Sequence, residues 1–277
     1  MKKAASQQTA PQNRSAVVVT GSTRGLGFAL AEELLKRGCR VTVSGRGPES
    51  VRQAVERLGA YGQRVHGLAC DVTDPVQVQD LWDSAARRCG RVDIWINNAG
   101  IAQEYVPAWE LEPQAMALLI ATNLLGTIYG SRTALRGMLA QGGGAIYNLE
   151  GWGSDGARRD GLTVYGTSKS AVRYFTRGLA DEATGTPVLV GTLSPGMMVT
   201  DFLTGPMKRM PESDAKRLRR VVNILGDHPQ TVARFLAPRI LANRRHRAHF
   251  AWLTGARAVG RFIAAVLRHR ELFAAPD

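Results

Sequence analysis

The chain has few cysteines and no long apolar run. Its 277 residues include 3 Cys, none in a Cys-x-x-Cys pair, which argues against a disulfide framework or a zinc site and fits a reducing compartment. No run of about 18 apolar residues occurs, so no membrane span is predicted. Residues 1–15 are polar and have no apolar signal-peptide core. We therefore expect a disordered leader there, no metal, and a cytoplasmic protein that could still associate with a membrane.

Acidic residues are also scarce. The chain has 23 Asp and Glu against 36 Lys and Arg, a formal net charge of +13. Residues 206–277 hold 15 of these basic residues and 5 of the acidic ones. Such a segment could attract nucleic acid, anionic lipid or an acidic substrate. Because no DNA-recognition helix or RNA-binding motif is visible, we do not expect a nucleic-acid partner.

The content of the chain favours one open α/β sheet. Hydrophobic residues make up 44% of it, which is enough for a large core. Short β-branched runs alternate with helical patterns, which predicts a Rossmann-type, doubly wound parallel sheet flanked by helices, with a C-terminal helical extension. Expected strands cover 16–20, 40–44, 65–69, 92–96, 145–149, 188–193 and 249–253. Expected helices cover 26–37, 75–89, 116–141, 165–183 and 228–241. We expect one domain over 16–255 with a substrate lid at about 201–227, then a basic amphipathic helix over 256–277.

A glycine-rich turn, Gly21-Ser-Thr-Arg-Gly-Leu-Gly27, follows the first expected strand directly. Glycines there let the backbone approach a pyrophosphate that sits on the next helix N-terminus. The second strand is followed by Arg46 instead of the acid that would bind a ribose 2′-hydroxyl. Arg46 and Arg24 favour a 2′-phosphate by charge and bidentate geometry, unless they are merely solvated. The prediction is NADP(H).

Tyr165 and Lys169 lie four residues apart at the start of a helical pattern. One helical turn places the phenol and the ammonium on the same face. A free tyrosine has a pKa of about 10, and we expect the ammonium of Lys169 to lower it. Reduction of a carbonyl by a nicotinamide needs an acid that protonates the alkoxide as it forms. Tyr165 is then that acid, and Lys169 adjusts the pKa of Tyr165 and holds the nicotinamide ribose.

The order of these motifs resembles the short-chain dehydrogenase/reductase family. The resemblance rests on Thr20-Gly-x-x-x-Gly-x-Gly27, Asn97-Asn-Ala-Gly100, Tyr165-x-x-x-Lys169 and Pro195-Gly196. It implies that Asn123, otherwise a satisfied core amide, anchors a water beside Lys169. It also implies a cofactor site made by Gly21, Ser22, Thr23, Arg24, Gly25, Leu26, Gly27, Arg46, Asp71, Val72, Asn98, Ala99, Gly100, Tyr165, Lys169, Pro195, Gly196, Met198 and Thr200.

One catalytic position departs from that family. Most relatives end the fifth strand in Asn-Ile-Ser-Ser, and the second Ser polarises the carbonyl. Here Glu150 and Gly151 stand at those positions, and the nearest hydroxyl is Ser154. Either the carbonyl donor is lost, or a reshaped loop lets Ser154 take its role. Ser154 could equally be an ordinary loop hydroxyl.

Asn148-Leu-Glu-Gly-Trp-Gly-Ser154 resembles the chlorophyll b reductases within that family, as do Leu193-Ser-Pro-Gly-Met-Met-Val-Thr-Asp201 and Val222-Asn-Ile-Leu225. This resemblance implies NADPH-dependent reduction of the C7 formyl of chlorophyll b or chlorophyllide b to hydroxymethyl, by a bacterial-type or processed plastid form. Gly151 and Gly153 would open room for a flat tetrapyrrole, and Trp152 would stack on it. The alternatives are reduction of another lipophilic ketone or aldehyde, such as a steroid or acyl chain, and NADP binding without catalysis. A homo-oligomer is expected.

The C-terminal segment carries an apolar stripe, made of Val259, Phe262, Ile263, Val266 and Leu267. Arg257, Arg261, Arg268 and Arg270 lie among or opposite these residues. We expect the stripe to pack on its own domain or on a partner subunit. The alternative is a helix that touches a membrane or a lipophilic substrate carrier.

Overall fold

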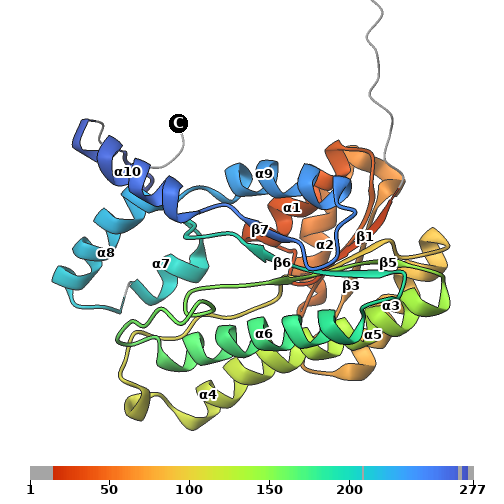
Figure 1. Ribbon diagram of the computed structural model, residues 1–277, viewed down its shortest axis with the longest axis horizontal. Coiled ribbons are helices and arrows are strands. Elements are labelled where there is room, and N and C mark those ends of the chain that lie inside the picture. The colour runs from red at the N-terminus through yellow and green to blue at the C-terminus, as the bar shows by residue number, and fades with distance from the viewer. Residues whose placement is uncertain (1–14, 208, 268–269, 274–277) are drawn as a thin grey trace, which may run out of the picture.

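The computed structural model describes residues 15–207, 209–267 and 270–273. Its centre is one sheet of seven parallel strands in the order β3-β2-β1-β4-β5-β6-β7 (Figure 1). The strands are β1 (Ala16–Val19), β2 (Arg40–Gly45), β3 (Val65–Ala69), β4 (Ile94–Asn97), β5 (Gly144–Leu149), β6 (Val188–Ser194) and β7 (His249–Ala251). The strand order reverses between β1 and β4, and open α/β sheets bind their ligands beyond the strand ends at such a point. The predicted doubly wound sheet is confirmed.

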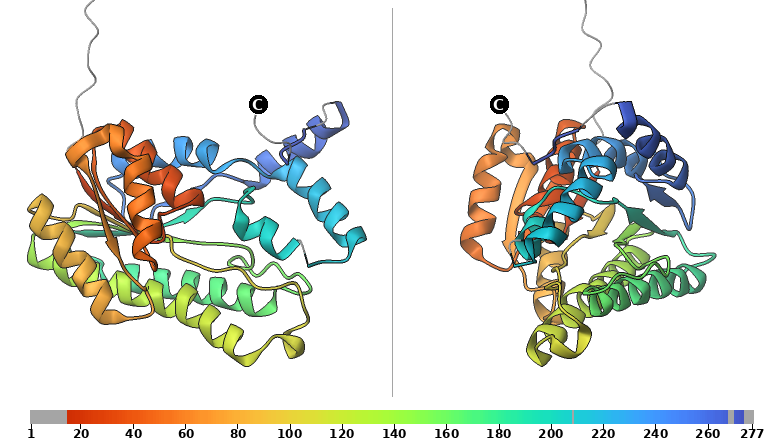
Figure 2. Two further views of the ribbon diagram at one scale, coloured as in Figure 1. Left: turned by 180° about the vertical axis from the view of Figure 1, so that it is seen from behind. Right: turned by 90° about the vertical axis from the view of Figure 1, so that its left-hand side faces the viewer.

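Helices cover both faces of the sheet (Figures 1 and 2). One layer contains α1 (Gly25–Lys36), α2 (Pro48–Arg57) and α9 (Pro229–Ala242). The other contains α3 (Pro75–Cys89), α4 (Pro113–Ile120), α5 (Gly126–Ala140) and α6 (Thr163–Glu182). A π-helical turn, Ala121–Leu125, joins α4 to α5, and short 3₁₀ turns occupy Gly59–Arg64 and Ala108–Glu110.

Coverage on both faces explains the unbroken apolar character of β1. Val17 and Val19 pack into the core under α1 and α9, whereas Val18 packs into the core under α3 and α5. Side chains alternate between the two faces of a strand, so a strand buried on both sides needs apolar residues throughout. Helix α2 was not predicted; it is short, mostly polar and begins with Pro48 in its first turn.

Three further helices form a group at one end of the molecule (Figure 1). They are α7 (Asp201–Met207), α8 (Glu212–Leu225) and α10 (Gly255–Leu267). Met207, Leu218 and Val222 form a small buried core between α7 and α8, and α10 lies against α8. The predicted lid therefore consists of two helices. Parts of the two predicted end regions lie outside the described residues. These are residues 1–14 of the predicted leader, and residues 268–269, which include Arg268, and 274–277 of the predicted C-terminal helix.

The orientation of α10 corrects one expectation. Its apolar side chains, from Val259 to Leu267, are between 51% and 86% exposed. Its basic residues face inward instead: Arg261 donates to the Leu225 carbonyl at the end of α8 and pairs with the buried Asp227 at 2.6 Å. The apolar stripe therefore does not pack on its own domain, because charge pairing at the end of α8 fixes the opposite face. None of the described helices is long and apolar enough to cross a bilayer.

Candidate active site

The ends of β1 and β4 are hydrogen-bonded to each other at the reversal of strand order. Thr20 Oγ1 accepts from the backbone N–H groups of Asn98 and Ala99, both at 3.0 Å. Asn98 Nδ2 in turn donates to the carbonyls of Thr20 (2.8 Å) and Gly21 (2.9 Å). The Asn-Asn-Ala-Gly loop thus holds the glycine-rich turn in a fixed position.

Two glycines of this turn lie so close to the Asn-Asn-Ala-Gly loop that no side chain would fit there. A Cβ on Gly21, whose φ is +60°, would lie 2.7 Å from Ala99 Cα, and one on Gly27 would lie 2.4 Å from Asn98 Nδ2. The backbone between them leads into α1, which has no acidic residue in its first turn. A helix N-terminus with free N–H groups and no local negative charge suits a pyrophosphate.

A cavity of about 1210 Å³ extends from this turn to Tyr165, Trp152 and Phe202. Most of the predicted site residues line it, including Arg24, Arg46, Ser154, Lys169 and Thr200. Ser22, Asp71 and Asn123 do not. Ser22 Oγ instead donates to Val19 O (2.6 Å) and accepts from Ser44 N–H (3.0 Å), and Asp71 Oδ1 accepts from the backbone and hydroxyl of Thr73. Both side chains therefore brace loops at the strand ends.

More basic residues line the cavity near the glycine-rich turn than the sequence suggested. Arg46 and Arg24 both reach it from separate loops, and Arg24 is also 3.7 Å from Asp201 at the start of the lid. Helix α2 adds Arg57 together with Ser50 and Gln53. These residues were missed because α2 itself was not predicted. The donor set suits a phosphate group.

Tyr165 and Lys169 lie on one face of α6, and both are buried. Lys169 Nζ is 6.0 Å from the centre of the Tyr165 ring and donates to the Leu149 carbonyl at 3.2 Å. Phe202 of α7 contacts the same ring edge-on at 5.7 Å. A phenol, an ammonium and the end of β5 thus meet at the cavity wall.

Burial dominates the ionisation of both groups. It raises the pKa of Tyr165 above the ordinary value of 10, and Tyr105 acts in the same direction. Burial also lowers the pKa of Lys169 from 10.5 to about 8, against the attraction of Glu150. The expected lowering of the Tyr165 pKa by Lys169 is therefore not found in the chain alone, because desolvation of the phenolate outweighs it. The phenol keeps its proton, as a donor in a reduction requires.

Asn123 lies in the π-helical turn between α4 and α5. Its Oδ1 accepts from Ile101 N–H at 2.8 Å, and its Nδ2 donates to Ile101 O (3.1 Å) and Ser168 Oγ (3.3 Å). The side chain thereby ties the loop after β4 to α6. Such π-turns occur often at functional sites. The role of Asn123 in holding a water stays a prediction.

Gly151 lies against Tyr165 and Lys169. A Cβ there would be 2.4 Å from the Tyr165 hydroxyl and 3.1 Å from Lys169 Cγ. Gly153, with φ +88°, approaches the Gly166 backbone of α6, where a Cβ would be 2.6 Å from Cα. The interpretation that these glycines open room for a large ring is therefore wrong, since Tyr165, Lys169 and α6 take up that space.

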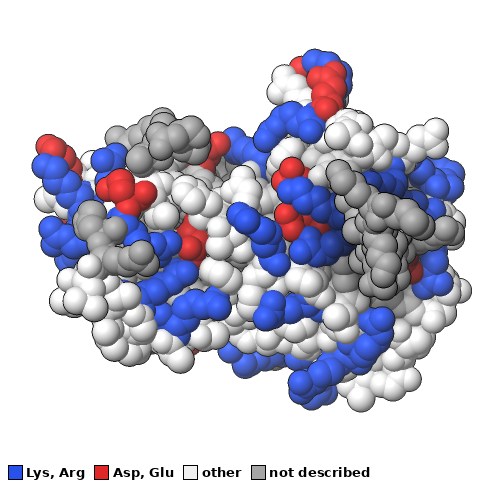
Figure 3. All heavy atoms as spheres, turned by 90° about the horizontal axis from the view of Figure 1, so that it is seen from above, with Lys and Arg blue, Asp and Glu red and all other residues white. Residues whose placement is uncertain are grey.

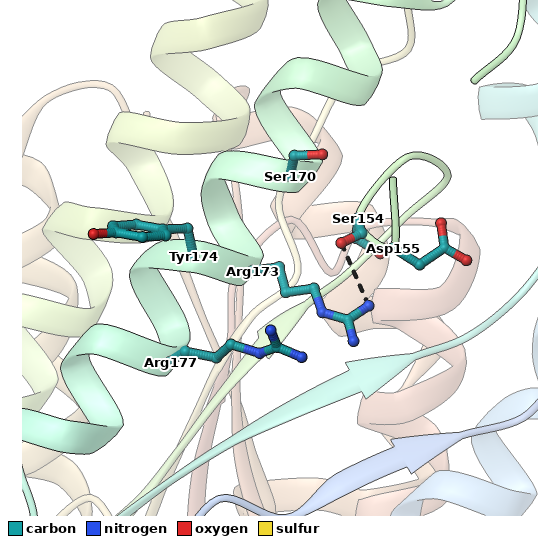
Figure 4. Close-up of a pocket in the computed structure, with 6 residues that line it drawn as sticks. All are labelled: Ser154, Asp155, Ser170, Arg173, Tyr174 and Arg177. Atoms are coloured by element: carbon teal, nitrogen blue, oxygen red, sulfur yellow. Dashed lines mark hydrogen bonds between the residues drawn. The ribbon is translucent and has the colours of Figure 1, made fainter. Parts of the chain in front are cut away.

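Ser154 lies on the loop that follows Gly151. It lines the large cavity and also a hollow of about 250 Å³ on the outer side of the loop (Figure 4). There Arg173 and Arg177 extend from α6 toward the loop, and Arg173 donates to the Ser154 carbonyl at 3.3 Å. The role of Ser154 as a replacement carbonyl donor stays a prediction.

Gln103, in the loop after β4, was missed by the sequence reasoning. It is buried, lines the cavity and accepts from the backbone N–H of Tyr165 at 2.7 Å. The N-cap residue of α6, Leu162, makes no side-chain hydrogen bond, so Gln103 caps the first turn from another loop. No sequence signal could have shown this, because the contact joins residues 62 positions apart.

Comparison with known proteins agrees with this geometry. Residues 15–209 match the short chain dehydrogenase family. The chain belongs to the short-chain dehydrogenase family. The match covers all elements from β1 to α7 and thus every site residue named above.

Among relatives of this short-chain dehydrogenase, the rice protein "Probable chlorophyll(ide) b reductase NYC1, chloroplastic" is 34% identical over 93% of this chain and 53% of its own. The Arabidopsis thaliana "Chlorophyll(ide) b reductase NOL, chloroplastic" is 35% identical over 93% of this chain and 74% of its own. The chain thus spans about half the length of the first relative. A solved actinorhodin polyketide ketoreductase with NADPH superposes with a TM-score of 0.76, at 28% identity over 88% of this chain and 98% of its own.

Proposed function

We propose that the chain is an NADPH-dependent reductase of the C7 formyl group of chlorophyll b or chlorophyllide b. The observation that carries the proposal is the extent of the similarity. The general family match ends at residue 209, whereas the match to the chlorophyll(ide) b reductases covers 93% of the chain. It therefore includes the predicted lid and the segment before α10, from which Leu218, Leu225 and Leu253 line the cavity.

The residues at the two ends of the cavity fit a nicotinamide dinucleotide with a 2′-phosphate. Gly21 and Gly27 let the turn pack directly against Ala99 and Asn98 at the N-terminus of α1, and a tight glycine turn before a helix is what a pyrophosphate needs. Arg24, Arg46 and Arg57 would hold the 2′-phosphate, and Lys169 would hold the nicotinamide ribose. When bound, NADPH supplies the hydride.

The residues of the protein then supply the proton for the carbonyl oxygen and stabilise the negative charge that remains. Reduction of a formyl group adds one hydride to its carbon and one proton to its oxygen. Tyr165 donates that proton, since burial keeps its phenol protonated. The ammonium of Lys169 stabilises the phenolate that remains. Phe202 and the buried walls around Tyr165 limit access of water to the transfer.

The test is to mix the protein with NADPH and chlorophyllide b and to follow the Soret band. A shift to the hydroxymethyl product, absent in Tyr165→Phe, is the expected result. Turnover of a steroid or acyl ketone with no change in the pigment spectrum would reject the pigment and keep the reductase. Binding of NADPH with no oxidation across a panel of carbonyl compounds would indicate a non-catalytic binding protein.

We also propose that α10 contacts an anionic lipid surface. Its exposed stripe includes Phe262, Ile263 and Val266, and its arginines fix the other face inward. Arg217 and Arg220 on the adjacent α8 are exposed, and the view of the molecule from above in Figure 3 shows more Lys and Arg than Asp and Glu at the surface. Apolar insertion together with basic residues is typical of interfacial helices.

Vesicle flotation tests this contact. The chain should bind vesicles that contain anionic lipid more tightly than neutral ones, and Phe262→Asp with Ile263→Asp should abolish binding. Equal binding of the double variant would reject the proposal. A self-associating chain whose double variant becomes monomeric would instead assign the stripe to a second copy. The relatives are described as chloroplastic, and the predicted cytoplasmic location stays a prediction.

A further inference from the structure

Glu150 is a buried carboxylate that the reaction chemistry does not use directly. Its side chain, at the end of β5, is 3% exposed. Oε2 accepts from His249 Nε2 of β7 at 3.1 Å, and Oε1 lies 3.7 Å from Arg173 Nε of α6. Its backbone N–H also donates to Leu193 O of β6 at 2.9 Å. A buried carboxylate is costly unless it is paired, so its retention at this position calls for a role.

The residues on either side of Glu150 touch the catalytic pair. The carbonyl of Leu149 accepts from Lys169 Nζ at 3.2 Å. Gly151 packs so closely on the Tyr165 hydroxyl and the Lys169 stem that an added Cβ would reach both. A displacement of the end of β5 would therefore move the acceptor of Lys169 and the surface that supports Tyr165 together.

The charge of Glu150 acts on the same lysine. Arg173 of α6 and His249 of β7 lie against the carboxylate, and Lys169 of α6, whose Nζ donates to the neighbouring Leu149 carbonyl, is attracted by its charge. Burial lowers the pKa of Lys169 to about 8, and the carboxylate of Glu150 opposes that effect. Arg173 competes for the carboxylate and adds a like charge one turn away from Lys169 on α6.

We propose that Glu150 is a positioning residue, which fixes the end of β5 between α6 and β7 and supplies the counter-charge of the buried Lys169 ammonium. The acid of the Glu-Gly-Trp-Gly-Ser element thus acts through Lys169. This inference rests on the role of Lys169 in the proposed reduction. It does not depend on the pigment, because any carbonyl substrate that the protein reduces reports on Lys169.

The first test is the pH profile of kcat/KM for Glu150→Gln. Glutamine keeps an acceptor for His249 and removes the charge. The alkaline fall, caused by loss of the Lys169 proton, should move to lower pH by about 1 unit, while activity at low pH stays within about threefold of the wild type. A uniform loss at every pH, with no shift of the profile, would mean that Glu150 is only structural and would overturn the proposal.

Two matched variants sharpen the result. Arg173→Gln frees the carboxylate and removes a like charge, so its alkaline fall should move to higher pH. Because Arg173 is partly exposed, this variant also serves if Glu150→Gln does not fold. His249→Gln keeps a donor and leaves the carboxylate charge unchanged, so its profile should match the wild type. An Arg173→Gln profile that is unchanged or shifted downward contradicts the proposal.

A readout without turnover separates this proposal from the proposed function. A double-mutant cycle of Glu150→Gln and Lys169→Met measures their coupling in the free energy of unfolding. Coupling should be present at pH 7, where Lys169 is charged, and should vanish at pH 9.5. Coupling that is absent at pH 7 or identical at both pH values rejects the counter-charge. Coupling without reduction of any carbonyl would keep the pair and reject the reductase.

Discussion

Gly151→Ala tests whether the position of the Tyr165 hydroxyl limits the reaction. The added Cβ would lie 2.4 Å from that hydroxyl, whereas ordinary contact begins at 3.4 Å, so the two atoms must separate by about 1 Å. Lys169 Cγ and Cε, at 3.1 and 3.2 Å, close off the other side. The ring is buried and packed on Phe202, so the hydroxyl moves away from its place on the cavity wall.

The expected cost follows from that distance. A displacement of about 1 Å in a reacting group can lower the rate by about 10²-fold. We therefore expect kcat for Gly151→Ala to fall by about 10²-fold in the Soret-band assay. The dissociation constant of NADPH, measured by fluorescence titration, should change much less. The backbone of Gly151 is outside the left-handed region, so alanine introduces no backbone strain there and the variant should fold.

Gly178→Ala is the matched control. It lies on α6 as the Tyr165–Lys169 pair does, and an added Cβ meets no atom within 4 Å. It should leave kcat unchanged and stabilise the helix by roughly 0.5–1 kcal/mol. If Gly151→Ala keeps kcat within about threefold of the wild type while Gly178→Ala behaves as expected, the close packing of Gly151 on Tyr165 has no catalytic meaning.

Three further predictions concern single side chains. Ser154→Ala should lower kcat by about 10²-fold if this hydroxyl polarises the carbonyl; a change below about threefold assigns that role to Tyr165 alone. Arg46→Asp should weaken NADPH binding far more than NADH binding in fluorescence titrations, and equal losses would refute the 2′-phosphate assignment. Lys169→Met should abolish activity yet raise the free energy of unfolding at pH 7. The pKa of Lys169 is lowered from 10.5 to about 8, so its buried ammonium destabilises the fold by up to roughly 3 kcal/mol below pH 8, and this cost disappears as the pH rises to 10.5. Chemical denaturation of the wild type and of Lys169→Met at pH 7 and pH 10.5 measures this cost. A difference in the free energy of unfolding between the two proteins that does not shrink at pH 10.5 would contradict the predicted sign.

The sequence alone predicted much of the fold, because the signals that define it are local. The apolar runs gave the strands to within a few residues, and helix α3 was predicted with its observed bounds, Pro75–Cys89. The spacing of Tyr165 and Lys169 needed only the pitch of one helix. The glycine-rich turn could also be read locally, since it joins consecutive elements. Helix α2 was missed because it is short and mostly polar, with Val51 and Ala54 as its buried residues.

The contacts that complete the site join distant segments, and the tertiary structure decided them. Gln103 caps the helix of Tyr165 across 62 positions, and Glu150 pairs with His249 across 99. No local pattern encodes such distances.

The sequence also did not determine which face of α10 turns toward the protein, because this depends on contacts with a distant segment. An amphipathic helix has two usable faces, and the buried Asp227 at the end of α8 selected the basic one. The sequence by itself thus determined the family, and with it the prediction of a reductase, through motifs that each lie within one turn or one helix. The tertiary structure decided what surrounds those motifs. Gly151 supports the Tyr165 hydroxyl, Glu150 faces Arg173 of α6, and the apolar stripe of α10 is exposed. Those outcomes depend on which elements meet in space, and burial and charge pairing settle them only once the chain has folded.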